Sequence, residues 1–292
     1  MTMARSCSRK PWSRFTAKIS KRFRRGSAAA RHFLHRKAGW CATLGIPVKA
    51  VTFAFVGLYD TVSSYGGNFD DDVDELGLRL GDAALQKVVH LTARNEYRKN
   101  FSLTTIASAI AAGVGYELEL PGVHSDVGGG YPERARETVE DVSLVYKTAL
   151  IAAGWYTEAQ FARHVRQVFG REVGDPWYVG KRFIRYHYQL IPLEIMQKLA
   201  TKYGMQFSRA QGAKKANLTL PPDDAQLAAA RQTLVQFALQ NDRAHSVQAL
   251  FATNTQQRWV RNRYLHRSVS DSTGMGPRLT KDGKPNRQRI AG

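Results

Sequence analysis

The sequence predicts an α/β protein, in which a parallel sheet is flanked by helices and the C-terminal part is mainly helical. Two short apolar runs, Val48–Leu58 and Tyr116–Leu120, have the length and composition of strands. Each run leads directly into a turn rich in glycine and polar residues. In open α/β sheets such turns follow the carboxyl ends of the strands, where reactive groups collect. Helical patterns lie between and after the two runs, which completes the prediction.

The elements of the first half follow from local composition. Gly26–Trp40 is predicted to be a helix, because Ser27 can cap it and three alanines follow. Val48–Leu58 is rich in β-branched and aromatic residues, which suits a strand buried on both faces. The acidic stretch Asp70–Glu75 suits the start of a helix, and Ala84–Lys99 is predicted to continue as one.

The second half is predicted to be mostly helical after the strand Tyr116–Leu120. The predicted helices are Val142–Trp155, Glu158–Phe169 and Asp223–Gln240. Val179–Gln197 is mixed and rich in aromatic residues, and Gln211–Pro222 is predicted to be a loop. From Arg267 onward the chain is polar, basic and interrupted by glycine and proline, which predicts a loosely ordered tail.

Positive charge is concentrated at the N-terminus. The 292 residues include 43 Lys and Arg against 24 Asp and Glu, a net charge of +19. None of the first 59 residues is acidic and 13 of them are Lys or Arg, so this stretch carries about two thirds of the net charge. The rest of the chain is only mildly basic.

Three interpretations of the first 25 residues stay open. A basic arm could bind phosphate groups of nucleic acid or lipid. An acid-free start rich in arginine and serine is also typical of a transit peptide, although no amphipathic stripe is present. The third interpretation is that the segment is translated from DNA upstream of a truncated or frame-disturbed gene.

Several classes of protein and site are excluded by composition. No run of 18 uncharged apolar residues is present, so we expect no transmembrane segment, and no apolar region marks a signal peptide. Cys7 and Cys41 are too few for a disulfide framework or a four-cysteine metal site. The acidic stretch at Asp70 lacks the glycine and the distal glutamate of a calcium loop. No metal or organic cofactor is indicated, because the acyl-transfer chemistry considered below needs none.

Two residues at the ends of the predicted strands can carry chemistry. Asp60 follows the first strand directly, and His124 stands four residues after the second. A carboxylate that orients an imidazole, and an imidazole that removes a proton, are two thirds of a nucleophilic hydrolase site. In the alternative, Asp60 only accepts hydrogen bonds from its turn, His124 is a loop histidine, and Gly128–Gly130 is a phosphate-binding nest.

The segments around these residues resemble a known family. FVGLYDTVSSYG (55–66) and ELPGVHSDVGGGYPE (119–133) are similar to the catalytic core of the type VI secretion phospholipase effectors, α/β-hydrolases of the Tle1 type. The resemblance runs from Phe23 to Tyr131 and is faint at Tyr264–His266. It implies a partial α/β-hydrolase-like sheet. His90, Glu96 and Arg98 resemble a helix of that family.

The resemblance assigns roles to matching residues. Asp60 takes the role of the triad acid and His124 that of the general base. The family's nucleophile elbow is Gly-Phe-Ser-Arg-Gly, and here Arg24 stands where the serine belongs and Arg22 replaces the first glycine. A guanidinium is always protonated and cannot attack an ester. Ser27, one turn into the predicted helix, is a weak substitute.

The resemblance therefore implies a serine-type phospholipase that hydrolyses acyl esters of membrane phospholipids and whose activity is impaired. It also implies secretion machinery and a cognate immunity protein as partners, with the chain cytoplasmic in the producing bacterium before type VI delivery into target cells. Nucleic acid is not the expected partner. The alternative is a non-catalytic protein that uses its basic N-terminal arm on membrane or nucleic acid.

Four segments are expected along the chain. Residues 1–21 are a basic, disordered N-terminal segment, and residues 22–140 are a partial α/β-hydrolase catalytic domain. Residues 141–266 continue as a helical part, and residues 267–292 form the basic polar tail. Because no apolar run precedes the elbow, the leading strands of the hydrolase sheet have no counterpart, and we expect an N-terminally truncated member of the family.

Overall fold

The computed structural model describes residues 52–65, 70–71, 78–80, 85–207, 219–269 and 276–292. The predicted basic arm and the predicted helix Gly26–Trp40 lie outside the described residues, as does most of the loop predicted at Gln211–Pro222. The boundaries expected at residues 21, 140 and 266 stay predictions.

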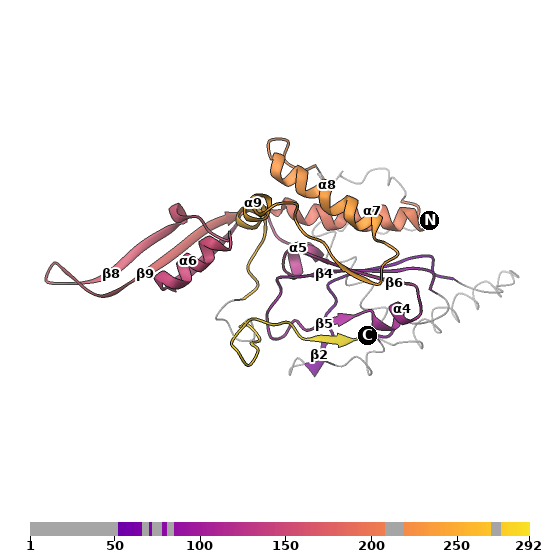
Figure 1. Cartoon of the computed structure of the whole chain (residues 1–292), viewed down its shortest axis with the longest axis horizontal. Coiled ribbons are helices and arrows are strands. Elements are labelled where there is room, and N and C mark those ends of the chain that lie inside the picture. Colours follow the sequence, from indigo (N-terminus) through magenta and orange to yellow (C-terminus); the bar gives the residue numbers. More distant parts are fainter. Residues whose placement is uncertain (1–51, 66–69, 72–77, 81–84, 208–218, 270–275) are drawn as a thin grey trace, which may run out of the picture.

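A four-stranded parallel sheet forms the centre of the molecule, and the predicted α/β fold is confirmed (Figure 1). Its strands, in spatial order, are β1 (Val56–Tyr59), β4 (Val88–Ala93), β6 (Gly115–Leu120) and β10 (Ser246–Gln248). The prediction of a strand at Tyr116–Leu120 is confirmed with one added residue. Of the strand predicted at Val48–Leu58, residues 48–51 lie outside the described residues, and the regular strand in the described part is Val56–Tyr59. Its side chains are half-buried rather than fully buried, since among the described strands β1 pairs with β4 alone.

The predicted helix at Ala84–Lys99 is wrong, because this stretch holds the central strand β4. All six residues of β4 are buried, with β1 on one side and β6 on the other. Val88, Val89 and Thr92 are β-branched, and such residues fit a strand covered on both faces. His90 consequently lies on a strand and not on the helix that the resemblance implied.

Helices cover one face of this sheet. The helices α7 (Leu190–Lys202) and α8 (Ala225–Gln240) pack together above β4 and β6, and α9 (Asn254–Tyr264) contacts α8 (Figure 1). They share one apolar core with the buried side chains of the sheet. The predicted helix Asp223–Gln240 is confirmed, and it begins where the Asp224 carboxylate accepts a hydrogen bond from the Leu227 N–H.

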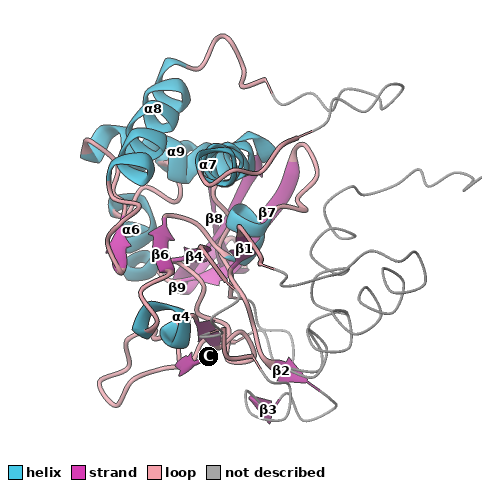
Figure 2. Ribbon diagram, turned by 90° about the vertical axis from the view of Figure 1, so that its right-hand side faces the viewer, coloured by secondary structure: helices cyan, strands magenta, loops and turns pink. Residues whose placement is uncertain are grey.

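Short elements cover the other face. They are β5 (Leu103–Thr105), α4 (Ala107–Ala111) and β11 (Arg289–Ala291), and β11 pairs with β5 in parallel (Figures 1 and 2). The structure differs here from the expected loosely ordered tail, because residues 276–292 lie against the sheet layer. Backbone pairing supplies the order that the polar composition of this segment does not suggest.

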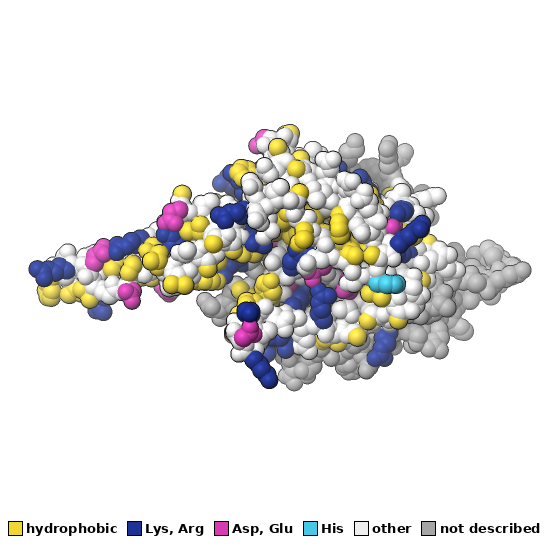
Figure 3. Space-filling view, viewed as in Figure 1, with side chains coloured by type: hydrophobic (Ala, Val, Ile, Leu, Met, Phe, Trp, Pro, Cys, Tyr) yellow, Lys and Arg dark blue, Asp and Glu magenta, His cyan; other side chains and the backbone are white. Residues whose placement is uncertain are grey.

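A second sheet projects from the body as an arm (Figure 1). It is antiparallel, in the order β7 (Ala135–Val142), β9 (Arg171–Ile184) and β8 (Phe161–Val168), with α6 (Leu144–Ala152) packed on one face. The predicted helix at 142–155 is confirmed as α6. The helix predicted at Glu158–Phe169 is wrong, since only Glu158–Gln160 forms a single 3-10 turn and β8 follows. Apolar and charged side chains of both signs are mixed on the surface of the arm (Figure 3).

Among the residues that the structure describes, none of the helices combines the length and the apolar character needed to cross a membrane. A two-residue antiparallel pair, β2 (Ser64–Tyr65) with β3 (Asp70–Asp71), lies beside the carboxyl end of β1. Asp70 and Asp71, the first two residues of the acidic stretch that was predicted to start a helix, therefore form a strand.

Candidate active site

Asp60 stands at the carboxyl end of β1 and is fully buried. Its backbone takes the left-handed region, with φ of +41°, and its N–H donates to the Leu91 carbonyl at 2.7 Å. Its carboxylate Oδ1 accepts the Ala93 N–H at 2.7 Å. The end of β1 is thereby tied to the end of β4, and the carboxylate is held at the edge where parallel strands gather functional groups.

His124 meets this carboxylate from the end of β6, which is separated from β1 by β4 in the sheet. It is the first residue of α5 (His124–Gly128), which follows β6, and its Nδ1 lies 2.8 Å from Asp60 Oδ2. The imidazole is one-third exposed, whereas the carboxylate is fully shielded. The structure thus brings together the two predicted site residues, which stand 64 positions apart in the chain.

The loop around His124 is held by the residues that follow β4. Glu96 Oε2 accepts the His124 N–H at 3.2 Å, and the same carboxylate is paired with Arg98 at 2.7 Å. The ring of Phe101 packs edge-on against the imidazole, 5.3 Å between centroids. Because Asp60 occupies Nδ1, the imidazole carries its proton there when neutral, and Nε2 is the nitrogen that can accept a proton.

Arg287 completes the surroundings of Asp60, and the sequence did not point to it. Its Nη1 lies 2.6 Å from Oδ1 and its Nη2 lies 2.9 Å from Oδ2, which is a two-pronged ion pair. Its Nε donates to the Phe101 carbonyl at 2.7 Å. Arg287 belongs to the segment expected to be a loose tail and stands 227 residues after Asp60, so no local pattern links the two.

These contacts decide the charge of Asp60. Complete burial opposes ionisation, but the positive charge of Arg287 and the hydrogen bond with His124 outweigh it and hold the pKa of the Asp60 carboxyl well below its usual range. Asp60 is therefore a carboxylate at neutral pH. An ionised acid on Nδ1 is the state that a hydrolase triad requires.

A second pair of acid and histidine lies behind the site. His266 Nδ1 is 2.8 Å from Asp126 Oδ1, and the His266 N–H donates to Oδ2 at 3.0 Å. Tyr131 stacks on the His266 ring, with centroids 3.4 Å apart. Burial raises the pKa of Asp126 in spite of the opposing hydrogen bond from His266. This pair fastens α5 to the segment after α9, which is the segment with the faint resemblance at Tyr264–His266.

His90 has a structural place under the site. The Thr61 N–H donates to Nε2 at 3.1 Å, so Nε2 is unprotonated and Nδ1–H donates to Glu117 Oε2 at 3.1 Å. Burial favours the neutral form of Glu117, yet the hydrogen bond from His90 lowers the pKa of this carboxyl. His90 thus links β1, β4 and β6 as a neutral ring, and both of its nitrogens are occupied.

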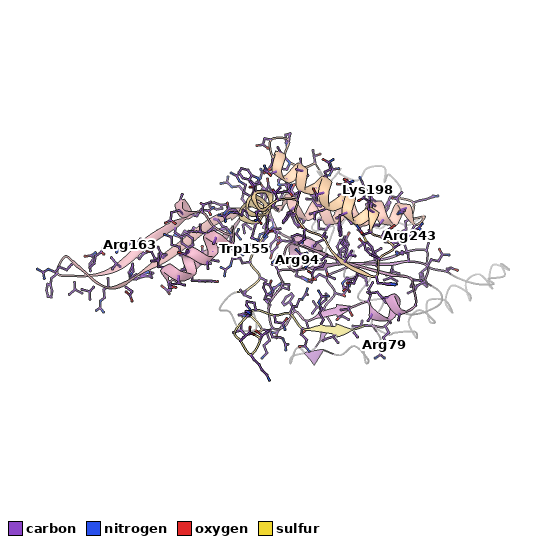
Figure 4. The ribbon with its side chains drawn as sticks, in the orientation of Figure 1. Arg79, Arg94, Trp155, Arg163, Lys198 and Arg243 are labelled. Atoms are coloured by element: carbon purple, nitrogen blue, oxygen red, sulfur yellow. The ribbon has the colours of Figure 1, made fainter. Side chains whose placement is uncertain are left out.

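The remaining charged groups at this edge are also tied to the fold. Arg94 follows β4 and contacts Glu119 at 3.0 Å and the Ala249 carbonyl at 2.8 Å (Figure 4).

In the glycine turn, the Gly130 N–H donates to Gln189 at 2.8 Å. A phosphate-binding nest needs free N–H groups, so this contact disfavours the nest interpretation of Gly128–Gly130. Within the described residues, no three His, Cys, Asp or Glu side chains are grouped as a metal site.

The third part of a triad cannot be located in the same way, because Arg24 and Ser27 lie outside the described residues. The structure positions a buried carboxylate, Asp60, and an imidazole, His124, that is one-third exposed. It shows that they are in hydrogen-bond contact and that a guanidinium holds the acid from the opposite side.

Comparisons with known proteins concern the sequence family and the fold. Residues 10–149 match the family described as "T6SS, Phospholipase effector Tle1-like, catalytic domain". A similar solved structure is titled "Structure of the Tle1 effector bound to the VgrG spike from the Type 6 secretion system". The two chains are 21% identical with a TM-score of 0.55, and the match covers 90% of this chain and 65% of the other. The chain thus spans just under two thirds of that protein's length, and no curated protein matches the sequence.

Proposed function

We propose that this chain carries the acid and the base of a serine-type phospholipase. The premise is that residues 10–149 match the Tle1-like catalytic domain family of type VI secretion phospholipase effectors, as the sequence predicted. The substrate would be an acyl ester of a membrane phospholipid. The observation that supports this proposal best is the 2.8 Å contact between Asp60 Oδ2 and His124 Nδ1 at the carboxyl ends of parallel strands.

The proposed mechanism follows from the orientation of the imidazole. His124 Nε2 takes the proton of the attacking hydroxyl, and ionised Asp60 stabilises the imidazolium that forms. Nε2–H then protonates the leaving oxygen of the lysophospholipid, and an acyl-enzyme remains. Water attacks this ester in a second round through the same base, which releases the fatty acid.

The nucleophilic serine is the part of the site that this chain lacks at the matching position. Arg24 occupies the matching position and cannot donate a hydroxyl, and Arg22 replaces the glycine that relieves crowding in the elbow turn. We therefore expect the chain as it stands to hydrolyse phospholipid and short acyl esters at close to the background rate.

A double replacement tests this proposal. Arg22→Gly with Arg24→Ser should raise hydrolysis of a short acyl ester by at least about 100-fold, because it restores the hydroxyl beside an existing base. Adding Asp60→Ala or His124→Ala to that variant should remove the gain. Brisk hydrolysis by the unaltered chain that survives both alanine changes would contradict the proposed roles. Brisk hydrolysis that Ser27→Ala abolishes would identify Ser27 as the nucleophile.

The partners are part of the same proposal. The solved relative is described as bound to a VgrG spike, and we expect this chain to bind a spike protein of the same class and to be neutralised by a cognate immunity protein. Its place would be the cytoplasm of the producing bacterium until delivery. Co-purification of the full chain with the spike protein checks the first of these expectations.

The acid-free N-terminal stretch favours a second candidate, a non-catalytic protein that binds anionic surfaces through residues 1–21. Binding to anionic vesicles or nucleic acid should then weaken steeply with salt and disappear when residues 1–21 are deleted. Binding that is indifferent to salt or to the deletion would eliminate this candidate.

A further inference from the structure

The Asp60 carboxylate has four donors around its two oxygens. Oδ1 receives the Ala93 N–H and Arg287 Nη1, and Oδ2 receives His124 and Arg287 Nη2, all within 2.9 Å. The side chain of Asp60 is fully buried and that of Arg287 is 8% exposed. The ion pair is therefore shielded from water. Opposite charges in such a shielded position interact more strongly than they do at the protein surface.

The backbone fixes the guanidinium independently of Asp60. Arg287 Nε donates to the Phe101 carbonyl at 2.7 Å, and Nη1 also reaches the Ala93 carbonyl at 3.2 Å. The next residue is tied down as well, because the Gln288 carbonyl accepts the Leu103 N–H at 2.8 Å just before β11 pairs with β5. The Arg287 guanidinium is therefore held in place by backbone contacts as well as by Asp60.

The acidic groups near His124 each have a partner of their own. Asp60 is matched by Arg287, and Glu96, which accepts the His124 backbone N–H, is matched by Arg98. Behind α5, Asp126 is matched by its contact with His266, and the Tyr131 ring stacks on that histidine. A bare carboxylate beside an imidazole strongly favours the protonated ring, whereas a carboxylate already paired with a guanidinium favours it much less.

We infer that Arg287 is a positioning residue of this active site, which fixes the Asp60 carboxylate and offsets its charge so that His124 stays neutral and able to accept a proton near pH 7. The inference rests on the proposed roles of Asp60 and His124. The C-terminal segment would then be part of the catalytic apparatus, although it touches no reacting atom.

An NMR titration of the His124 ring protons in the full chain tests this inference without any need for hydrolysis. Arg287→Gln should raise the midpoint of the His124 titration by about one pH unit, because the Asp60 charge is no longer offset. Arg287→Lys keeps the charge and should shift the midpoint by less than half of that amount. Arg289→Gln is the matched control, since Arg289 lies on β11, pairs with Glu117 and Glu119, and does not contact Asp60. The midpoint of the His124 titration in Arg289→Gln should equal that in the unaltered chain.

Two results would overturn the inference. One is a folded Arg287→Gln variant whose midpoint matches that of Arg289→Gln. The other is a rise that persists when Asp60→Asn is added, because the effect must pass through that carboxylate. Should Arg287→Gln not fold, a shift in Arg287→Lys as large as one unit would count equally against the inference. If the titration behaves as expected but the Arg22→Gly, Arg24→Ser variant gains no hydrolysis, the proposed activity alone is refuted.

Discussion

At the scale of single residues, the site depends on a buried carboxylate in a backbone conformation that few side chains adopt. Asp60 has φ of +41°, and its left-handed turn aims the carboxylate at the Ala93 N–H and at His124. Strain of this kind persists only where several contacts fix the residue, and functional sites are where it clusters. Here Arg287 supplies the largest share of those contacts.

The lowered pKa of Asp60 predicts how stability depends on pH. In the unfolded chain the carboxyl has an ordinary pKa near 4, whereas in the folded chain its pKa lies well below the usual range. Its contribution to stability is therefore complete above about pH 5 and is lost progressively as the pH falls below about 4. Urea unfolding between pH 7 and pH 3 should show a steeper loss for the unaltered chain than for Asp60→Asn.

Asp175→Asn is the control for this prediction, because Asp175 is an exposed carboxyl on the arm. It should leave the pH profile of the unaltered chain unchanged. Parallel profiles for Asp60→Asn and Asp175→Asn would show that Asp60 is not held ionised in the folded state.

At the scale of elements, two predicted helices are strands, and the reasons differ. β4 reads VVHLTA without alternation, because both of its faces are covered, and periodicity does not separate such a strand from a buried helix. In β8 the alternation of apolar and polar residues is weak. Its strand conformation depends on pairing with β9, which follows after a two-residue turn. The helices α6 and α8 were predictable because each begins at a polar residue whose side chain caps it.

The turn between β8 and β9 offers a test at this scale. Phe169 and Gly170 both have positive φ, +50° and +77°, as in the tight turns typical of hairpins. Phe169 is fully exposed, so its replacement removes no packing. Phe169→Asn should stabilise the hairpin by about 1 kcal/mol, because asparagine adopts this conformation more readily than phenylalanine.

Gly170→Ala is the opposite change, and it should cost about 1 kcal/mol through the backbone alone, since a Cβ at this position meets no atom within 4 Å. Hydrogen exchange of the β8 and β9 amides reports both variants. Slower exchange in the Gly170→Ala variant than in the Phe169→Asn variant would contradict the turn geometry.

At the scale of the whole molecule, one buried arginine joins the arm to the body. Arg182 on β9 pairs with Glu137 on β7 at 2.8 Å. It also donates to four backbone carbonyls, three on the body side (Arg261, Asn262 and Leu265) and that of Trp155, which follows α6. Trp155 lies where the arm meets the body, and Arg163 lies farther out along the arm (Figure 4). Although burial opposes ionisation, the charge of Arg182 lowers the pKa of Glu137.

Arg182→Met should therefore destabilise the protein by about 3–5 kcal/mol, because it leaves Glu137 buried without its charged partner and removes a donor from several buried carbonyls. Arg163→Gln is the matched arginine replacement, and because it breaks an exposed ion pair with Glu172 its effect should be far smaller. Chemical unfolding of the two variants measures the difference. Equal effects would show that Arg182 does not join the arm to the body.

The sequence by itself determined the α/β class, two of the strands, the residues at their ends and the resemblance to the Tle1-like family. These features are local, since a buried strand followed by a glycine-rich turn can be read within a dozen residues. The tertiary structure decided that β4 is the central strand, that residues 276–292 return to the sheet, and that Arg287 holds Asp60 across 227 positions. Such contacts depend on charge and on backbone pairing between distant segments, which leave no periodic pattern in either segment.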